Sequence, residues 1–325
     1  MIAILILNWN GWKDTIECLR SLQQMDYKDY FVVLGDNGST NESMSEITRY
    51  CKSENITIRP EVLCEESLKD VCPGDVILYD LKTNNGFAKG NNLMIKYCQR
   101  FDPDYYFLLN NDTEVFPNFM NVLLSFHDKH PEYDVLTPLI PFYYEKDKIW
   151  NAGGRLFWGF RKYFYAGAYR TEIKESDYLK CSFVTGCAMF ITPKCLKSDG
   201  CLFSEAFFFG EDDFELALRF RKEKVKQACV LNSIIYHKVS SSSKAYANYD
   251  KIFIHYLNRY INLRQNLSNL SFEIWRIVNN LYLKHILKGK FTNQEILSFV
   301  KELNSECYRL DGVSKDYFEK RLKIR

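Results

Sequence analysis

The sequence predicts an α/β protein in which a mostly parallel sheet is flanked by helices and followed by a helical C-terminal extension. In the first 110 residues, short apolar runs rich in β-branched residues alternate with stretches of helical spacing. Such alternation is typical of parallel strands joined by helices that cover both faces of a sheet. Residues 249–325 show helical spacing instead, so we divide the chain into residues 1–243 and 244–325.

Apolar runs and turn signals place the elements of the first half. Each apolar run ends where Asn, Asp or Gly begins a turn, and helical spacing starts soon after. Residues 51–74 carry charges and a Pro-Gly turn, which indicates an inserted surface excursion. Buried strands are predicted at residues 2–8, 31–37, 75–81 and 105–110, and helices at residues 14–25, from Ser39 or Thr40 to about Tyr50, and at 88–100.

The pattern of the second half is less regular. The Gly- and aromatic-rich stretch at residues 150–160 predicts a loop, and residues 207–222 should begin as a turn and continue as a helix. Strands are predicted at residues 135–141, 182–191 and 230–236. In the C-terminal region an amphipathic helix is predicted from apolar residues three or four positions apart, namely Phe272, Trp275, Val278, Tyr282 and Ile286.

Composition excludes several classes of protein. The net charge of +2 gives no general argument for nucleic acid, so no nucleic-acid partner is expected. The 11 cysteines include no C-x-x-C pair, which favours buried thiols in the cytoplasm over a disulfide framework or a zinc site. No run approaches the roughly 20 apolar residues of a membrane span. We therefore expect a cytoplasmic protein.

The charge is unevenly distributed along the chain. Residues 244–325 hold 15 Lys and Arg against 8 Asp and Glu, a net charge of +7, whereas the preceding 243 residues carry −5. This region can be a helical subdomain that only packs on the body. It can also be a basic amphipathic surface that makes peripheral contact with an anionic membrane, at the inner face of the cell membrane.

Polar residues follow all four strands predicted in the first half. Asn8 and Asp36 lie at the ends of the first two, Asn85-Gly86 follows the third, and Asn110-Asn111-Asp112 ends the fourth. In open α/β sheets, ligands bind outside the carboxyl ends of the strands. One polar strand end is ordinary turn chemistry, but four at one edge predict a site.

Asp112 and His237 are candidate ligands of a divalent cation. A strand-end carboxylate can hold Mg²⁺ or Mn²⁺ together with diphosphate oxygens, and neutral imidazole also binds such metals. Both residues have structural alternatives, because Asp112 can cap the turn at Thr113-Glu114 and a single histidine is usually structural. The remaining histidines lack a comparable context: His127, His130, His255 and His285.

Four carboxylates lie within five residues near the start of the helix predicted at residues 207–222. They repel one another, so they need a cation, hydrogen-bond donors or solvent. A solvated, acidic first turn is one interpretation, since a helix N-terminus favours negative charge. The flanking aromatic and apolar residues favour a partly buried carboxylate with a raised pKa, which can act as a general base. The cluster consists of Glu211, Asp212, Asp213 and Glu215.

The Gly- and Asn-rich turn at residues 84–92 leads from a predicted strand into a predicted helix. Its backbone N–H groups and Lys89 could meet a phosphate. It matches neither a Walker A loop nor G-x-G-x-x-G, so it is a weak signal in isolation.

In this order, these segments resemble family 2 glycosyltransferases, in particular the bacterial branch of rhamnosyl- and galactofuranosyl-type transferases. The resemblance implies a GT-A nucleotide-diphospho-sugar fold and inversion at the anomeric carbon. It makes residues 1–243 the catalytic domain, with a donor-binding half at about 1–115 and an acceptor and catalytic half at about 116–243. The matching segments are ILILNWNGWKDTIECLRSL, LGDNGSTN, NNGFAKGNN, LLNNDTEV, TGCAMFI, FFFGEDDFELALRFR and IIYH, which cover roughly residues 2–240.

The resemblance also implies roles for residues on the donor side. Asp36 would bind the base or ribose of the nucleotide. The family's D-x-D motif falls on Asn110-Asn111-Asp112, where Asp112 would bind the metal together with His237 and the first position is Asn instead of Asp. Further contacts with the nucleotide and the donor sugar would come from Asn8, Trp9, Asn10, Asn85, Gly86, Lys89, Asn92, Asn110 and Asn111.

Arg219 sets the register of the acidic cluster. The family's pattern is acidic–Asp–x–acidic–Leu–x–x–Arg, and counting back from Arg219 makes Asp213 the catalytic base, with Asp212 beside it in the catalytic pair. Contacts with the acceptor and the sugar would come from Gly186, Cys187, Glu215 and Arg219.

The expected function is transfer of a sugar from a nucleotide-diphospho-sugar donor to a glycan or lipid-linked acceptor, assisted by Mg²⁺ or Mn²⁺, in the synthesis of surface polysaccharides. One alternative is a sugar-nucleotide nucleotidyltransferase, but the first loop lacks the glycines and basic residues that a triphosphate needs. The other is a non-catalytic sugar-binding relative, against which the intact Asp112, Asp213 and His237 argue.

Overall fold

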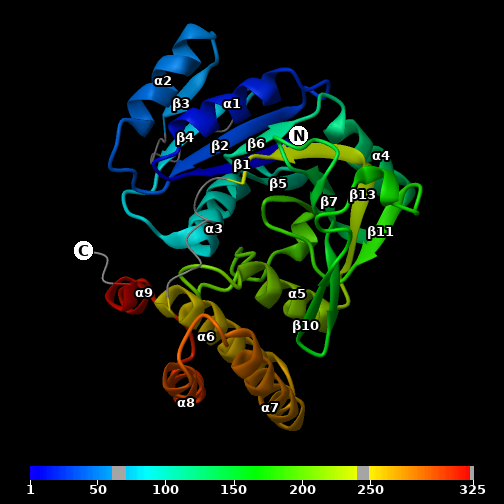
Figure 1. The fold of residues 1–325 in the computed structure, drawn as a ribbon. Helices are drawn as coiled ribbons and strands as arrows, with labels where there is room; N and C mark the ends of the chain where they lie inside the picture. Colours follow the sequence, from blue (N-terminus) through cyan, green and yellow to red (C-terminus); the bar gives the residue numbers. More distant parts are fainter. Residues whose placement is uncertain (61–70, 240–248, 323–325) are drawn as a thin grey trace.

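The computed structural model describes residues 1–60, 71–239 and 249–322, and eleven strands within these ranges form one central sheet (Figure 1). The strands of the first half are β1 (Ile2–Asn8), β2 (Tyr30–Asp36), β3 (Ile58–Pro60), β4 (Val76–Asp80) and β5 (Tyr105–Asn110). Those of the second half are β6 (Thr113–Val115), β7 (Tyr133–Pro141), β8 (Ile149–Asn151), β11 (Tyr178–Cys181), β12 (Ala188–Ile191) and β13 (Lys226–His237).

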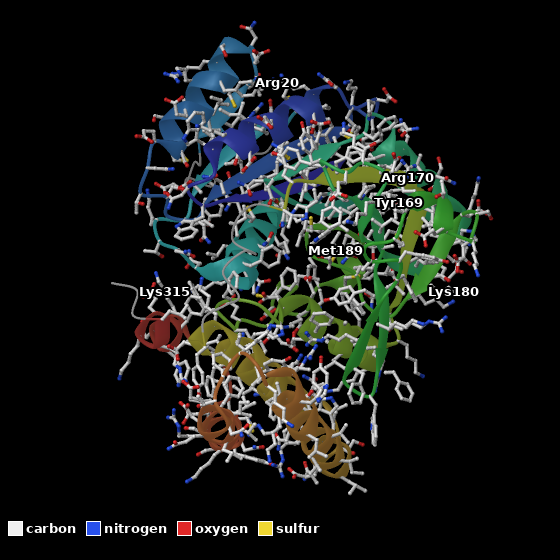
Figure 2. The ribbon with its side chains drawn as sticks, viewed as in Figure 1. Arg20, Tyr169, Arg170, Lys180, Met189 and Lys315 are labelled. Carbon is white, nitrogen blue, oxygen red and sulfur yellow. The ribbon has the colours of Figure 1, made fainter. Side chains whose placement is uncertain are left out.

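The strand order is β11-β13-β7-β12-β5-β1-β2-β4-β3, with β6 paired to β13 and β8 to β7. The neighbouring strands β3, β4, β2, β1 and β5 all pair in parallel, which confirms the prediction of a mostly parallel sheet. Beyond β5 the sheet becomes mixed, because β12 runs antiparallel to both of its neighbours. In Figure 2, Met189 of β12 lies inside the molecule, whereas Lys180 lies on the edge strand β11 at the surface.

Helices cover both faces of the sheet, and alternate residues of β1 point into different cores. Ile2, Ile4 and Ile6 pack with α1 (Trp12–Gln23), α2 (Ser43–Ser53) and α4 (Phe119–Lys129). Ala3 and Leu5 pack on the opposite face with α3 (Gly86–Cys98) and α5 (Asp212–Glu223). This two-sided burial explains why the strand reads as a continuous apolar run.

The C-terminal extension is helical, as predicted, and has its own core. It comprises α6 (Tyr249–Asn266), α7 (Asn269–Ile286), α8 (Asn293–Arg309) and α9 (Lys315–Leu322). Phe207 and Leu218, which come from the body, are part of the same core. The helices form a separate lobe below the sheet in Figure 1. The predicted boundary between residues 243 and 244 lies outside the described residues.

Three predictions about the second half need correction. Residues 150–160 are not a loop: they contribute to β8 and to a hairpin of β9 (Gly154–Phe157) and β10 (Phe160–Tyr163). Its two turn residues, Trp158 and Gly159, have φ values of 50° and 84°, the positive pair that a type I′ turn requires. Only Ala188–Ile191 of residues 182–191 is a strand. In the amphipathic helix, Val278 and Tyr282 are exposed.

Smaller differences concern the first half and the chain as a whole. α2 begins at Ser43 instead of Ser39 or Thr40, since those residues bind the β1 loop. Within the predicted surface excursion, Ile58–Pro60 extends the sheet as β3, and residues 61–70 lie outside the described residues.

Every cysteine in the described ranges is a free thiol. None of the described helices has the length and apolarity needed to cross a bilayer.

Candidate active site

The ends of β1, β2 and β5 lie together at one edge of the sheet. In register, Asn8 of β1 is paired with Asp36 of β2, and Leu7 of β1 with Asn110 of β5. In chain order, β2 and β4 are added to the sheet on one side of β1, and β5 then pairs with β1 on its other side. Such a reversal of strand order opens a crevice at the carboxyl ends of the strands.

Asn8 and Asp36 form a buried pair at the base of this crevice. The Asn8 Nδ2 group donates to Asp36 Oδ1 over 2.7 Å, and Asn8 Oδ1 accepts from the Thr15 hydroxyl over 3.0 Å. Asp36 also accepts bonds from the backbone N–H and the hydroxyl of Ser39. Asn8 is fully occupied in joining β1, α1 and the loop after β2. Asn8 was predicted to bind the nucleotide itself, but the structure uses its amide to fix the position of the Asp36 carboxylate.

Trp9 and Asn10 form the exposed rim of the β1 loop. Asn10 adopts φ 56°, and it exchanges hydrogen bonds with Ser39 and Thr40. Trp9 is 56% exposed, which is unusual for so large an apolar side chain, and it lines a predominantly apolar cavity. An exposed indole held on an ordered loop can stack on a planar ring of a ligand.

The turn before α3 is held against the β2 loop by Asn37, which sequence reasoning did not single out. Asn37 donates to the Gly86 carbonyl over 3.2 Å and accepts from the Asn85 backbone N–H over 2.9 Å. Gly86 has φ 74°, and a Cβ there would lie 2.2 Å from the Phe208 carbonyl oxygen. Glycine at this position therefore allows the donor-side turn to touch the segment before α5.

Two residues predicted for the donor pocket are placed differently by the structure. Asn92 is buried, and its amide bonds the backbone of Leu202 and Phe203 and the Glu205 carboxylate, so its hydrogen-bonding groups are used within the protein. This corrects the prediction of a donor contact. Lys89 is exposed in the first turn of α3.

Asn110, Asn111 and Asp112 form a tight turn after β5. The Asn110 N–H donates to the Cys187 carbonyl over 2.8 Å, and the Asn111 amide donates to Thr15 and to the Gly11 carbonyl. Both asparagines thus order the loops around the crevice. β6 follows at once and pairs with β13, with Thr113 opposite His237. This pairing brings together two residues that are 125 positions apart, Asp112 and His237.

Asp112 and His237 are both buried, with Asp112 Oδ1 3.1 Å from His237 Nε2. This distance is close to the roughly 3 Å between adjacent ligands of an octahedral cation with bonds of about 2.1 Å. His237 Nδ1 is buried without a hydrogen-bond partner in the described residues, so the ring is held by the Trp150 ring instead, at 4.2 Å between centroids. No three His, Cys, Asp or Glu side chains of residues 1–60, 71–239 and 249–322 could hold a metal alone. The pair fits a cation that takes its other ligands from phosphates and water.

Asp213 lies in the first turn of α5, on the other side of the crevice. Its Oδ1 accepts a 2.8 Å hydrogen bond from the backbone N–H of Gly186. Burial raises the pKa of Asp213 to about 6, and the Gly186 N–H partly opposes this rise by favouring the ionised form. A carboxylate with a pKa just below neutral is suited to accept a proton from a substrate hydroxyl.

The adjacent Asp212 is more deeply buried than Asp213. Burial, followed by the charge of Asp213, raises the pKa of Asp212 well above the usual range of a carboxyl. Its Oδ1 has no hydrogen-bond partner among the described residues. Burial thus opposes ionisation of both adjacent carboxyls, and Asp213 is the one whose charged form the Gly186 N–H stabilises.

Glu211 is not part of a solvated acidic turn. It forms an ion pair with Arg161 of β10 and accepts a 2.8 Å hydrogen bond from Asn262 of α6. The Arg161 guanidinium also stacks over the Phe214 ring, with 3.3 Å between its central carbon and the ring centroid. Sequence reasoning missed Arg161 and Asn262, because no local pattern connects them to the acidic cluster. Their contacts join the hairpin, α5 and α6 beside Asp213.

The residues predicted for acceptor contacts divide into two groups. Gly186 and Cys187 connect the two sides of the crevice, since Gly186 binds Asp213 and Cys187 binds Asn110. Burial raises the pKa of the Cys187 thiol well above its usual value, so the neutral thiol acts as an apolar side chain in the wall of the crevice. Arg219 instead donates to the Cys195 and Leu202 carbonyls and pairs with Glu223, which corrects its predicted role at the sugar. Glu215 is half-buried nearby, and burial raises its pKa.

A cavity of about 430 Å³ lies between the strand ends and the C-terminal lobe. Trp9, Asn84 and Gly86 line its donor side, while aromatic and apolar side chains dominate elsewhere. His255, which no local sequence pattern marked, also lines this cavity. Burial, together with nearby Arg259, lowers the pKa of His255 to about 4, so the ring is neutral at pH 7. The other lining residues are Leu7, Asn37, Phe87, Phe208, Phe209, Gly210, Lys251, Ile254, Asn258, Phe318 and Leu322.

Several solved structures share this fold. They include GalNAc-T7 with UDP, GalNAc and Mn²⁺ (TM-score 0.59, 14% identity, 99% of this chain and 56% of that chain covered). The mannosyltransferase PcManGT from Pyrobaculum calidifontis, in complex with GDP-Man and Mn²⁺, has a TM-score of 0.56 at 11% identity, with 95% and 75% covered. S. aureus TarS 1–349 in complex with UDP has a TM-score of 0.54 at 14% identity, with 99% and 87% covered. The chain thus spans just over half the length of GalNAc-T7.

At these identities the structural likeness establishes the fold, which is of the GT-A type. A search of curated proteins found no match. Residues 3–197, more than half of the chain, match the family described as Glycosyl transferase family 2. The chain therefore belongs to glycosyl transferase family 2 and is a glycosyltransferase.

Proposed function

We propose that the protein transfers a sugar from a nucleoside-diphosphate donor to an acceptor hydroxyl with inversion, and that Asp213 is the base. The observation that carries this proposal is the Asp213 carboxylate, bound by the Gly186 N–H and given a pKa of about 6 by burial. Gly186 and Cys187 connect this carboxylate to the turn that holds Asp112. The base and the anionic end of the donor can thus lie on opposite sides of one crevice.

In the proposed reaction, the acceptor oxygen attacks the anomeric carbon while its proton passes to the Asp213 carboxylate. The bond from the anomeric carbon to the diphosphate oxygen breaks with its electron pair, and the nucleoside diphosphate leaves. Asp112 and His237 would hold Mg²⁺ or Mn²⁺, whose charge would offset that of the diphosphate. Holding both substrates in line in the crevice supplies much of the rate enhancement.

The donor would bind across the strand ends. Asp36, fixed by Asn8 and Ser39, can accept hydrogen bonds from a ribose or base, and Trp9 can stack on the base. The turn at Asn85-Gly86 would border the sugar. The fold neighbours were solved with UDP and GDP-Man, which supports a nucleotide-sugar donor for this chain as well.

The acceptor would enter through the cavity lined by the C-terminal helices. Its predominantly apolar wall, with Phe208, Phe209 and Ile254, favours an acceptor that carries an apolar group, such as a lipid-linked glycan. The sequence resemblance to rhamnosyl- and galactofuranosyl-type transferases supports a place in the synthesis of bacterial surface polysaccharides.

A two-step experiment tests the proposal. Thermal shifts of the purified protein with UDP-, GDP- and dTDP-sugars, with and without Mn²⁺, would identify the donor. Release of free nucleoside diphosphate from that donor, with and without lipid-linked acceptors, would then measure transfer and hydrolysis. The proposal is wrong if no nucleotide sugar raises the melting temperature and none is turned over.

A further inference from the structure

The helix α7 has two apolar faces, and the described residues cover only one of them. Phe272, Trp275 and Leu283 are buried against the neighbouring helices, and Arg276 and Asn280 bind Asn304 of α8. A separate stripe of apolar residues spaced three or four positions apart is between 39% and 72% exposed. It consists of Leu270, Ile274, Ile277, Val278, Leu281 and Tyr282.

The hairpin of β9 and β10 continues this surface. Its turn touches α7, because a Cβ at Gly159 would lie 3.0 Å from the Trp275 indole nitrogen. Phe157 and Phe160 are opposite each other in register, and both are exposed, as is the turn residue Trp158. Arg155 and Lys162 form the next pair on the same face. We call α7's exposed stripe and this hairpin face together the α7 surface.

The charges around the α7 surface are basic. Lys284, Lys288 and Lys290 follow the apolar stripe, and none of them makes an ion pair within the described part of the chain. The hairpin contributes Arg155 and Lys162, and residues 151–163 contain no Asp or Glu. The only acidic residue of α7, Glu273, is paired with Arg276. The surface therefore combines exposed Trp, Phe, Leu and Ile with cations that have no acidic partner in residues 1–60, 71–239 and 249–322.

We propose that the α7 surface docks on an anionic lipid bilayer, with α7 lying in the plane of the interface. An amphipathic helix that joins a large apolar stripe to lysines binds by burying the stripe among the acyl chains while the cations contact lipid phosphates. Aromatic residues at the hairpin tip suit the interfacial region. A symmetric dimer through the same face would bring these cations against copies of themselves. This inference does not depend on the identity of the donor or the acceptor.

Co-sedimentation of the full chain with vesicles tests the proposal. We expect binding to phosphatidylglycerol-containing vesicles at low salt, weaker binding at high salt, and little binding to phosphatidylcholine alone. The double variant Ile277→Asp/Leu281→Asp should lower binding about a hundredfold, since each of the two side chains, once buried in the bilayer, contributes about 1.4 kcal/mol, a factor of about ten. The matched control Leu297→Asp changes an exposed leucine of α8 and should bind as the wild type does.

Charge is tested separately from apolar contact. Lys288→Glu/Lys290→Glu should weaken vesicle binding, whereas Lys301→Glu/Lys320→Glu, with the same change of net charge at exposed sites on α8 and α9, should weaken it much less. Nucleotide-sugar hydrolysis should be unchanged in all variants, which shows that they are folded. The proposal is overturned if the wild type does not sediment with anionic vesicles. It is equally overturned if the Ile277/Leu281 variant binds normally, or only converts an oligomer to a monomer.

Discussion

The backbone N–H of Gly186 donates a 2.8 Å hydrogen bond to Oδ1 of Asp213, and this bond joins the turn before β12 to the first turn of α5. Burial disfavours the charged carboxylate, whereas this N–H stabilises it. The carboxylate is thereby oriented while its pKa stays close to the pH at which a base must work.

Asp213→Asn should lower the rate of transfer by about a hundred- to ten-thousandfold, because the amide cannot accept the acceptor's proton. Donor affinity, measured by calorimetry, should change little. Glu223→Gln is the matched control, since Glu223 is an exposed carboxylate at the other end of α5. A variant with wild-type turnover would show that Asp213 is not the base.

The pH dependence should reflect the raised pKa of Asp213. The carboxylate works as a base only when it is ionised, so kcat/KM should fall about tenfold per pH unit below about pH 6 and level off above it. With an ordinary aspartate the fall would begin roughly two units lower, near pH 4. Donor affinity over the same range serves as the control. A profile that stays flat down to pH 5 would contradict this assignment.

Gly186→Ala should disturb the base without removing it. A Cβ at residue 186 would lie 2.8 Å from Asp213 Oδ1 and 2.8 Å from the Phe87 ring, so the carboxylate or the ring must move. We expect a fall in kcat of roughly tenfold or more with little change in donor affinity. The pH midpoint should rise as the N–H contact weakens. Gly289→Ala is the control: at φ 83° the new side chain strains the backbone far from Asp213, so it should lower stability without changing kcat.

Sequence reasoning identified those residues of the candidate site that lie in short-range patterns, such as the ends of apolar runs. Each strand-end residue is preceded by an apolar run. Parallel pairing of the two strands then places Asn8 beside Asp36, regardless of the conformation of the segment between them. The family resemblance, placed in register by Arg219, predicts Asp213 and not Asp212 as the base. In the structure it is Asp213 that contacts Gly186. The fold class could be predicted because strands buried on both faces produce continuous apolar runs.

The parts that were missed depend on contacts between distant segments. Arg161 binds Glu211 from a hairpin 50 residues upstream, and the same hairpin appeared in the sequence as a glycine-rich loop. Arg219 and Asn92 are residue types that often bind ligands. In this structure Arg219 donates to a backbone carbonyl of the Cys195–Glu205 segment, and Asn92 accepts from a backbone N–H of the same segment. A polar residue in a motif can thus serve the site by supporting a loop.

Loss of the Asp112–His237 pair should change the response to metal. His237→Ala removes one of the two proposed protein ligands, so the Mn²⁺ concentration giving half-maximal activity should rise roughly ten- to a hundredfold. Asp112→Asn should have a larger effect, because it also removes the negative charge. His285→Ala, at an exposed histidine of α7, is the control. If both site variants keep the wild-type Mn²⁺ response, the cation is bound elsewhere.

Arg161→Met should destabilise the protein, because among the described residues it leaves the buried Glu211 carboxylate with the Asn262 amide as hydrogen-bond partner and Arg259 as a nearby cation. Breaking one side of a buried ion pair typically costs roughly 3–5 kcal/mol, which urea unfolding would measure. Arg155→Met makes the same substitution on the exposed face of the same hairpin, and it should change the unfolding free energy by less than about 0.5 kcal/mol. Adding Glu211→Gln to Arg161→Met should recover part of the loss, since the unpaired charge is then gone. Equal stability of the two single variants would mean that the ion pair does not hold the hairpin against α5 and α6.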